Sequence, residues 1–215
     1  MTRLHPSNRC AVCLVRPQPL QAGFSLVTTL ILLIVVTLLG VGASQMVLLS
    51  EKSTRFDRDQ QIAFQAAELA LVDAEFDIRG PKLPGTDPSK TPRFDTFTGK
   101  TDKNVEFIDG CGTTSTSAGL CSDALVGGKS VMYGVDFTDT SANSKTVGFG
   151  QFTGRNFSTG STGLRSEIAP RYIIELIPDP VSSNTQPRVL YRVTAMGFGP
   201  KKETQAVIQM VFRKE

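Results

Sequence analysis

The most constraining feature of this 215-residue chain is a long uncharged stretch near its N-terminus. No Asp, Glu, Lys or Arg occurs between residues 17 and 50, and residues 24–49 are almost wholly apolar. About 20 apolar residues are enough for a helix to cross a bilayer. We therefore expect residues 24–49 to form a membrane-spanning helix. The side chains expected to face lipid, and later other helices in an assembly, include Phe24, Leu26, Leu30, Leu33, Val36 and Leu39.

The charges in front of this stretch predict its orientation. Arg3, Arg9 and Arg16 precede it, and no acidic residue does. By the positive-inside rule, the N-terminus would then be cytoplasmic and the C-terminal part would be a translocated domain. The chain has 23 basic and 20 acidic residues, so without these three arginines its formal charge is zero. The composition therefore gives no reason to expect a nucleic acid as a partner.

A helical pattern continues beyond the apolar stretch. The apolar residues of segment 50–79 recur at helical spacing, and the pair Gly80-Pro81 is a typical helix stop. The predicted apolar face consists of Ile62, Leu69, Val72 and Phe76, flanked by Ala63, Ala66 and Ala70. We expect one continuous helix from Phe24 to Arg79. Its second half would be amphipathic and would pack this face on the chain's own sheet rather than on a partner helix.

Three strands are strongly predicted near the C-terminus, at Arg171–Ile177, Arg188–Phe198 and Thr204–Arg213. An antiparallel meander with one apolar face needs a cover, and the amphipathic helix is the available one. Weaker strand patterns occur at Val105–Ile108, Ser130–Phe137 and Thr146–Phe152. The predicted fold class is therefore α+β. The predicted segments are a leader (1–23), a transmembrane half-helix (24–49), an amphipathic half-helix (50–80) and an exported, loop-rich β domain (81–215).

The four cysteines form two pairs on either side of the apolar stretch. Cys111 and Cys121 would face an oxidising compartment, where a disulfide between them should stabilise the fold by roughly 3 kcal/mol. Cys10 and Cys13 form a CxxC in the leader, with His5 nearby. A structural zinc site needs four ligands, and no second CxxC exists, so we expect two reduced thiols and no metal.

Candidate chemistry elsewhere is sparse, and we expect no enzymatic activity and no cofactor. The only histidine is His5, so the part after the leader has no Ser-His or Cys-His pair. The glycine-rich segment 148–154 lacks the GK[ST] ending of a phosphate-binding loop, and a loop beside a strand is the simpler interpretation. Asp136 and Asp139 lie among Ser and Thr residues that could ligate calcium. Solvated loop carboxylates are the more ordinary alternative.

Several motifs together resemble the type IV pilin superfamily. Residues 21–26 (QAGFSL) look like a class III, prepilin-peptidase signal, and residues 57–68 (DRDQQIAFQAAE) look like the helix signature of PilX-type minor pilins. The C-terminal segments 172–175 (YIIE) and 194–199 (TAMGFG) are also similar. The resemblance implies a type IV pilin-like fold. It also implies cleavage after Gly23 by prepilin peptidase and methylation of the new N-terminal Phe24.

One position departs from the common pilin pattern. Most pilins carry Glu as the fifth residue after the cut, and this chain has Thr28 there. PilX-type pilins and the K-type pseudopilins of type II secretion share this lack, which fits a subunit at a filament tip. The resemblance thus implies a non-enzymatic subunit of a complex that primes pilus assembly and supports adhesion and twitching motility. Its implied partners are other minor pilins, the major pilin, prepilin peptidase, the inner-membrane assembly platform and, in addition, a tip adhesin.

Three alternatives stay open at this point. The chain could be a K-type minor pseudopilin of a type II secretion system. It could be an exported soluble binding domain, with Phe24–Leu39 as the apolar part of an ordinary signal peptide and cleavage after Val41-Gly42-Ala43. It could also be a single-pass membrane protein that is never cleaved.

Overall fold

The computed structural model describes residues 24–80, 93, 96–97, 106–114, 116–122, 130–160, 164–179 and 189–214. The chain divides into two compact units, Met1–Glu51 and Lys52–Glu215, and each is considered by itself below. The predicted leader, with Gly23, the CxxC and His5, lies outside the described residues.

The predicted N-terminal helix is confirmed as α1 (Phe24–Arg79), a continuous α-helix of 56 residues. Its C-terminal end follows from the glycine that comes next. Gly80 has a φ of +82°, and its N–H donates to the carbonyl oxygen of Phe76 at 2.8 Å. A positive φ is easily reached only by glycine, and this bond satisfies one of the carbonyl groups left over at the helix end.

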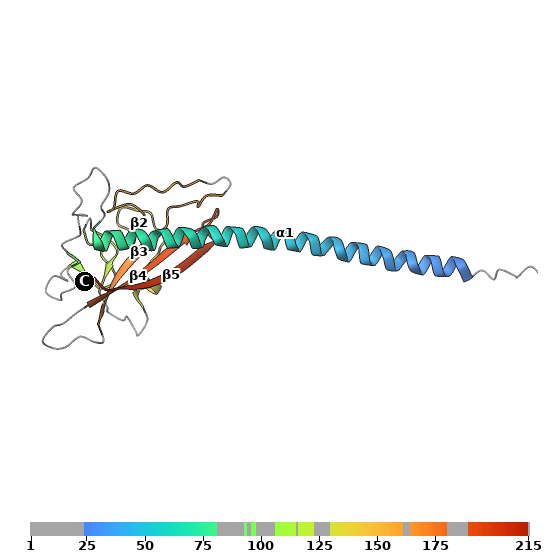
Figure 1. Cartoon of the computed structure of the whole chain (residues 1–215), viewed down its shortest axis with the longest axis horizontal. Coiled ribbons are helices and arrows are strands. Elements are labelled where there is room, and N and C mark those ends of the chain that lie inside the picture. Colours follow the sequence, from blue (N-terminus) through green and yellow to red (C-terminus); the bar gives the residue numbers. More distant parts are fainter. Residues whose placement is uncertain are drawn as a thin grey trace, which may run out of the picture. The chain divides into compact units, whose positions relative to one another are not determined.

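The predicted meander is also confirmed. Strands β3 (Arg171–Pro178), β4 (Val189–Phe198) and β5 (Gln205–Phe212) pair antiparallel in sequence order. Val193 of β4 lies opposite Ile174 of β3 and Met210 of β5. Within the second unit, the C-terminal part of α1 runs along these strands (Figure 1). The α+β fold class predicted from the sequence is therefore correct.

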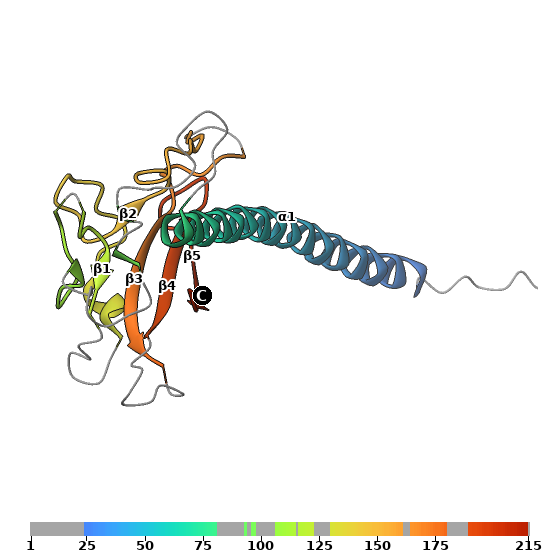
Figure 2. The same ribbon diagram turned by 60° about the vertical axis from the view of Figure 1, so that its left-hand side comes forward.

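The other edge of the sheet differs from the expectation. Two very short strands share the free edge of β3: β1 (Leu120–Cys121) pairs parallel to it, and β2 (Val147–Gly148) pairs antiparallel (Figure 2). The predicted strand Thr146–Phe152 is thus mostly a turn. Of the predicted strand Val105–Ile108, the described part contributes only an isolated bridge between Ile108 and Cys121.

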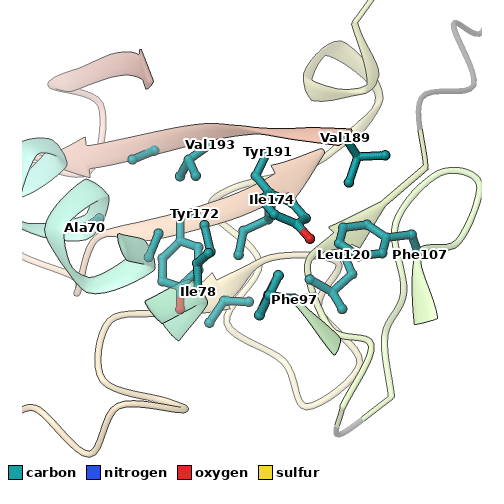
Figure 3. Close-up of a cluster of buried hydrophobic side chains, with 13 residues drawn as sticks. Ala70, Ile78, Phe97, Phe107, Leu120, Tyr172, Ile174, Val189, Tyr191 and Val193 are labelled. Carbon is teal, nitrogen blue, oxygen red and sulfur yellow. The ribbon is translucent and has the colours of Figure 1, made fainter. Parts of the chain in front are cut away.

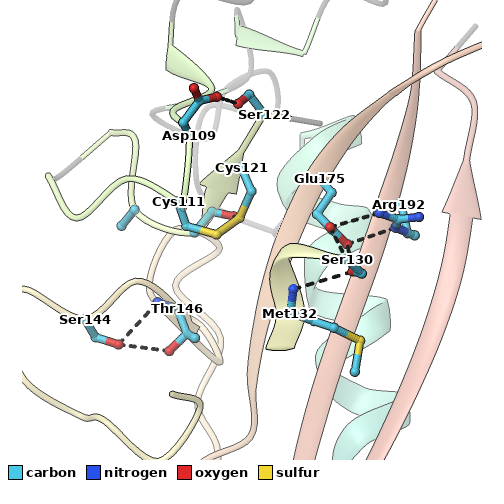
Figure 4. The surroundings of a disulfide bond; sticks show 12 residues. Asp109, Cys111, Cys121, Ser122, Ser130, Met132, Ser144, Thr146, Glu175 and Arg192 are labelled. Carbon is cyan, nitrogen blue, oxygen red and sulfur yellow. Dashed lines mark hydrogen bonds and ion pairs between the residues drawn. A yellow bond between two sulfur atoms is a disulfide. The ribbon is translucent and has the colours of Figure 1, made fainter. Parts of the chain in front are cut away.

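The predicted strand Ser130–Phe137 is wrong, because this segment contains the short 3-10 helix η3 (Val131–Gly134). Ser130 caps η3, accepting a hydrogen bond from the N–H of Met132. The same hydroxyl donates to the buried carboxylate of Glu175, which also pairs with the guanidinium of Arg192 at 2.9 Å (Figure 4). A serine tied to its own backbone and to a buried charge favours a turn over an extended strand.

The face of α1 that packs on the sheet is not the predicted face. The buried positions of its second part are small residues, two aspartates and one isoleucine: Ala63, Ala66, Ala67, Ala70, Asp73, Ala74, Asp77 and Ile78. Of the larger residues predicted to be buried, Leu69, Val72 and Phe76 are 42%, 40% and 38% exposed, and Ile62 is only partly buried.

Close approach of the helix to the sheet explains this choice of face. Gly197 of β4 lies directly under the helix, and a Cβ at this position would sit 2.1 Å from the carbonyl oxygen of Ala63 and 2.2 Å from the amide nitrogen of Ala67. Where two backbones approach this closely, there is room only for alanine and glycine. Large side chains on that face would hold the helix away from the sheet.

Beside this contact lies the main hydrophobic core (Figure 3). Ala70, Ala74 and Ile78 of the helix meet Ile174 and Val193 of the sheet there. The aromatic part of the core is formed by Phe97, Phe107 and Tyr191. Phe97 and Tyr191 pack edge to face with their ring centroids 5.4 Å apart. On the opposite side of the sheet, a smaller cluster includes the disulfide between Cys111 and Cys121 (Figure 4).

Candidate functional site

The first unit presents apolar side chains all around its helix. Of the side chains predicted to face lipid, the described ones are well exposed: Leu26, Leu30, Leu33, Val36 and Leu39. The most apolar part of this helix is not buried at all. By length and composition it can cross a membrane, although a signal sequence meets the same criteria. An apolar helix without a covering surface indicates membrane anchoring.

The start of this helix carries no buried charge. Thr28 occupies the place of the usual pilin glutamate, and its hydroxyl donates to the carbonyl oxygen of Ser25 at 2.9 Å. This bond turns the polar group back onto the backbone of its own helix, which makes threonine easy to accommodate in lipid. The side chain of Phe24, expected to be the methylated N-terminal residue, is not among the described ones.

The second unit exposes a narrower apolar surface on the same helix. We call Leu69, Val72 and Phe76 the exposed stripe; they follow one another at spacings of three and four, so they share one side of the helix. The guanidinium of Arg155 lies 4.8 Å from the ring centroid of Phe76 and touches one end of the stripe. Three large apolar side chains in a row, each about 40% exposed, form a surface suited to a neighbouring protein.

Two carboxylates, Asp73 and Asp77, fix the buried side of the helix to the domain. Asp77 pairs with the guanidinium of Arg93, and both side chains are fully buried. Arg93 also donates to the carbonyl oxygen of Ala118 at 2.6 Å, and the hydroxyl of Tyr172 donates to Asp77 at 3.0 Å. Burial raises the pKa of Tyr172 well above its usual value, and the nearby charge of Asp77 raises it further. The phenol therefore stays a hydrogen-bond donor.

The glycine-rich loop has a structural partner within the chain. Asp73 of the helix accepts hydrogen bonds from the N–H of Gly150 at 2.8 Å and from the hydroxyl of Thr153 at 2.5 Å. Gly150 has a φ of +78°, and a Cβ there would collide with the carbonyl oxygen of Arg155. The loop thus directs its donors at a carboxylate of its own chain, as a phosphate loop would at a phosphate. This supports the interpretation of a loop beside a strand.

The two aspartates considered for calcium stabilise turns. Asp136 accepts from the N–H and the hydroxyl of Thr138, at 2.8 and 2.7 Å, and Asp139 accepts from the N–H of Ser141 at 2.8 Å. These bonds to Ser141 lower the pKa of the exposed Asp139. Among the described residues, no group of three or more His, Cys, Asp or Glu side chains is placed to hold a metal ion.

Sequence reasoning missed the buried polar residues that position the helix. Asp73 and Asp77 are spaced four apart and fall on the same side as Ala66, Ala70 and Ala74. This spacing could have shown from the sequence that both aspartates lie on the alanine face. Their partners, Thr153 for Asp73 and Arg93 and Tyr172 for Asp77, come from distant parts of the chain, and no local pattern marks them.

An apolar N-terminal helix whose continuation packs by its small residues on an antiparallel meander defines a type IV pilin-like α+β protein. Comparison with protein families gives the same answer. The family described as "Type IV pilus assembly protein PilX C-term" matches residues 98–214, and the family "PilX N-terminal" matches residues 22–72. The chain belongs to the PilX family of type IV pilus assembly proteins, and its role is that of a minor pilin. No curated protein and no solved structure matches it significantly.

Membership of this family places the chain among structural components of the pilus, which associate with other pilus components and with the membrane assembly machinery. The N-terminal match begins at residue 22 and continues to residue 72. The match therefore covers the apolar part of α1 and part of its amphipathic continuation together. This extent argues against a short signal peptide that is followed by an unrelated exported domain.

Proposed function

We propose that this minor pilin is cleaved between Gly23 and Phe24 by prepilin peptidase, is methylated on Phe24, and joins a complex at the pilus tip that primes filament assembly. The observation that carries the proposal is the helix Phe24–Leu49, whose described apolar side chains are exposed on every side. Such a helix needs lipid before assembly and other helices after it. Through the filament, the subunit would contribute to adhesion and twitching motility.

The presence of Thr28 supports a position of this subunit at the tip of the pilus. The glutamate that most pilins carry at this position would engage the neighbouring subunit through its charge, and this chain has in its place an uncharged hydroxyl bonded to Ser25. A subunit with no neighbour beyond it does not need that charge. The same lack occurs in the K-type pseudopilins, but the family match over residues 98–214 favours the pilus over a secretion system.

The exposed stripe supports contact with other pilins in the exported part. Leu69, Val72 and Phe76 lie outside the apolar segment and away from the sheet, so a neighbouring minor pilin could bury them. The proposed topology is single-pass, with a cytoplasmic leader and a periplasmic domain before assembly. That orientation rests on the three leader arginines.

The direct test is the N-terminus of the protein extracted from membranes, determined by peptide mass spectrometry. We expect an N-methylated Phe24 in cells with prepilin peptidase and an intact leader in cells without it. A start at Ser44 would overturn the proposal in favour of an exported soluble domain. An intact Met1 in both strains would indicate a single-pass protein that is never processed.

Contact through the stripe is tested separately. Leu69→Glu with Val72→Glu should reduce co-purification with the other minor pilins by at least about tenfold, since two charges would be buried at the contact. The matched control is Val207→Glu with Val211→Glu, which adds the same two charges at exposed valines of strand β5. Equal co-purification of both variants would contradict the role of the stripe without affecting the processing proposal.

A further inference from the structure

A small polar cavity lies between the disulfide loop, the turn around residues 140–146 and strand β3. Its volume is about 220 Å³, and six of the ten residues that line it carry hydroxyl groups. The loop closed by Cys111 and Cys121 supplies one wall with Thr113 and Thr114. The volume is below the roughly 300–1,000 Å³ of sites for drug-sized ligands, so the cavity suits a single small molecule.

The most unusual residue of this cavity is Arg171 of β3, which is only 8% exposed. Its Nε donates to the hydroxyl of Thr146 at 2.5 Å, and its Nη2 donates to the carbonyl oxygen of Thr146 at 2.8 Å. No carboxylate in the described part of the chain forms an ion pair with it. By contrast, Arg93 and Arg192 each pair with a buried carboxylate through two nitrogens.

A buried guanidinium without an ion-paired carboxylate is costly, because desolvation disfavours its charged form. Burial accordingly lowers the pKa of Arg171 from its usual value. Asp139 opposes this shift through its charge, but it is a surface carboxylate held in the turn by Ser141. An anion inside the cavity would satisfy the guanidinium directly.

The hydroxyl groups next to Arg171 also supply more hydrogen-bond donors than the described acceptors use. The oxygens of Ser144 and Thr146 lie 2.9 Å apart and share one hydrogen bond (Figure 4). Two hydroxyl protons are present and that bond uses only one, so the other has no acceptor among the described residues. Both side chains are almost fully buried. Buried donors are nearly always paired, so a surplus indicates an acceptor that occupies the cavity.

We propose that this cavity binds a small carboxylate that also carries hydroxyl groups, of the size and chemistry of one sugar acid such as a uronic acid. The ligand carboxylate would accept from Arg171 and from the Ser144–Thr146 pair. The ligand hydroxyls would meet the hydroxyl-bearing rim, which includes Thr113 and Thr140. This binding function goes beyond pilus assembly and does not depend on processing at Gly23.

The test is binding of D-glucuronate to the full chain in detergent, measured by saturation-transfer NMR and compared with D-glucose and with acetate. Glucuronate should bind at least about tenfold more tightly than either, because only it presents both a carboxylate and ring hydroxyls. If glucose binds as well as glucuronate, Arg171 does not select an anion and the proposal fails. If acetate binds as well, the hydroxyl-lined wall contributes nothing and the sugar-acid assignment fails.

Three substitutions in the neighbouring turn test where the ligand binds without changing Arg171. Ala142→Leu fills the mouth of the cavity and should weaken glucuronate binding at least about tenfold, whereas Asn143→Leu on the same exposed turn does not line the cavity and should leave binding unchanged. Asp139→Asn keeps the turn's acceptor and removes a competing negative charge, so it should tighten binding by up to about fivefold. Wild-type affinity in Ala142→Leu, or weaker binding in Asp139→Asn, would overturn the proposal.

Discussion

The two parts of helix α1 use opposite side-chain chemistry. Before Glu51 the helix is apolar on every side, with no acidic or basic residue between residues 24 and 50. After Lys52 it buries alanines and two aspartates, and it exposes Leu69, Val72 and Phe76. The comparison teaches that apolar character alone does not predict burial in this helix. In the first part the apolar groups need lipid or other helices, and in the second part the shape of the contact decides which residues are buried.

The largest effect should come from charging the first part. Leu33→Arg with Val36→Arg places two charges near the middle of the apolar segment, at a cost of about 2.5–3.5 kcal/mol each. The protein should then be lost from the carbonate-resistant membrane fraction. The same pair of arginines at Gln65 and Glu68, both exposed in the second part, should leave membrane association intact. If the Leu33/Val36 variant stayed in the membrane fraction, the conclusion that the first part of α1 anchors the protein in the membrane would be wrong.

The next effect concerns the buried aspartates. Asp77→Ala should lower the free energy of unfolding by about 3–5 kcal/mol, because it leaves the buried Arg93 without its carboxylate. Urea unfolding of the full chain in detergent can be followed by tyrosine fluorescence, since the chain contains no tryptophan. Glu75→Ala, which breaks an exposed pair with Arg79, should change stability by less than about 1 kcal/mol.

A double variant sharpens this test. Asp77→Leu with Arg93→Met replaces the whole pair by apolar groups, and it should recover most of the stability that Asp77→Ala loses. If the double variant were as unstable as the single one, the cost would come from the lost bond to Tyr172 rather than from the uncompensated guanidinium.

A smaller effect tests the close contact between the helix and β4. Gly197→Ala should destabilise the second unit by about 1–3 kcal/mol, because its Cβ would press on the backbone of Ala63 and Ala67. Gly134→Ala is the control, since a Cβ at Gly134 meets nothing within 4 Å. Equal stability of the two variants, again by urea unfolding, would mean that the helix can move away from the sheet without cost.

The smallest effect should come from the exposed stripe. Leu69→Ala with Val72→Ala should change the free energy of unfolding by no more than about 0.5 kcal/mol per site, as is usual for surface substitutions. Ala70→Leu, between them but on the buried face, should destabilise by overpacking. A loss above about 2 kcal/mol at the stripe would show that these side chains support the domain's own core.

Much of the fold was predictable from local pattern. The bounds of α1 followed from periodicity and from the Gly80-Pro81 stop, and the three C-terminal strands followed from alternation and from the turn residues between them. The two-residue strands β1 and β2 were not predictable with their bounds. Each exists only because β3 offers a free edge to a distant segment, and two residues carry no periodicity.

The candidate functional surfaces also include one that the sequence predicted and one that it did not. The apolar segment and the motif around Gly23 were visible in the sequence, because a lipid environment demands uninterrupted apolar residues. The polar cavity at Arg171 was not visible. It requires the disulfide loop, the turn at 140–146 and β3 to meet, and their residues are separated by up to about 60 positions along the chain.

The sequence by itself determined where the helix begins and ends, that its first part needs an apolar environment, and that a meander follows. Each of these depends on neighbouring residues along the chain, through hydrogen bonds, turn conformations and the length of a bilayer. Only the tertiary structure decided which side of the helix meets the sheet. The distance between the helix and Gly197 excludes large side chains there. The two aspartates can be buried because distant residues supply their partners: Arg93 and Tyr172 for Asp77, and Gly150 and Thr153 for Asp73.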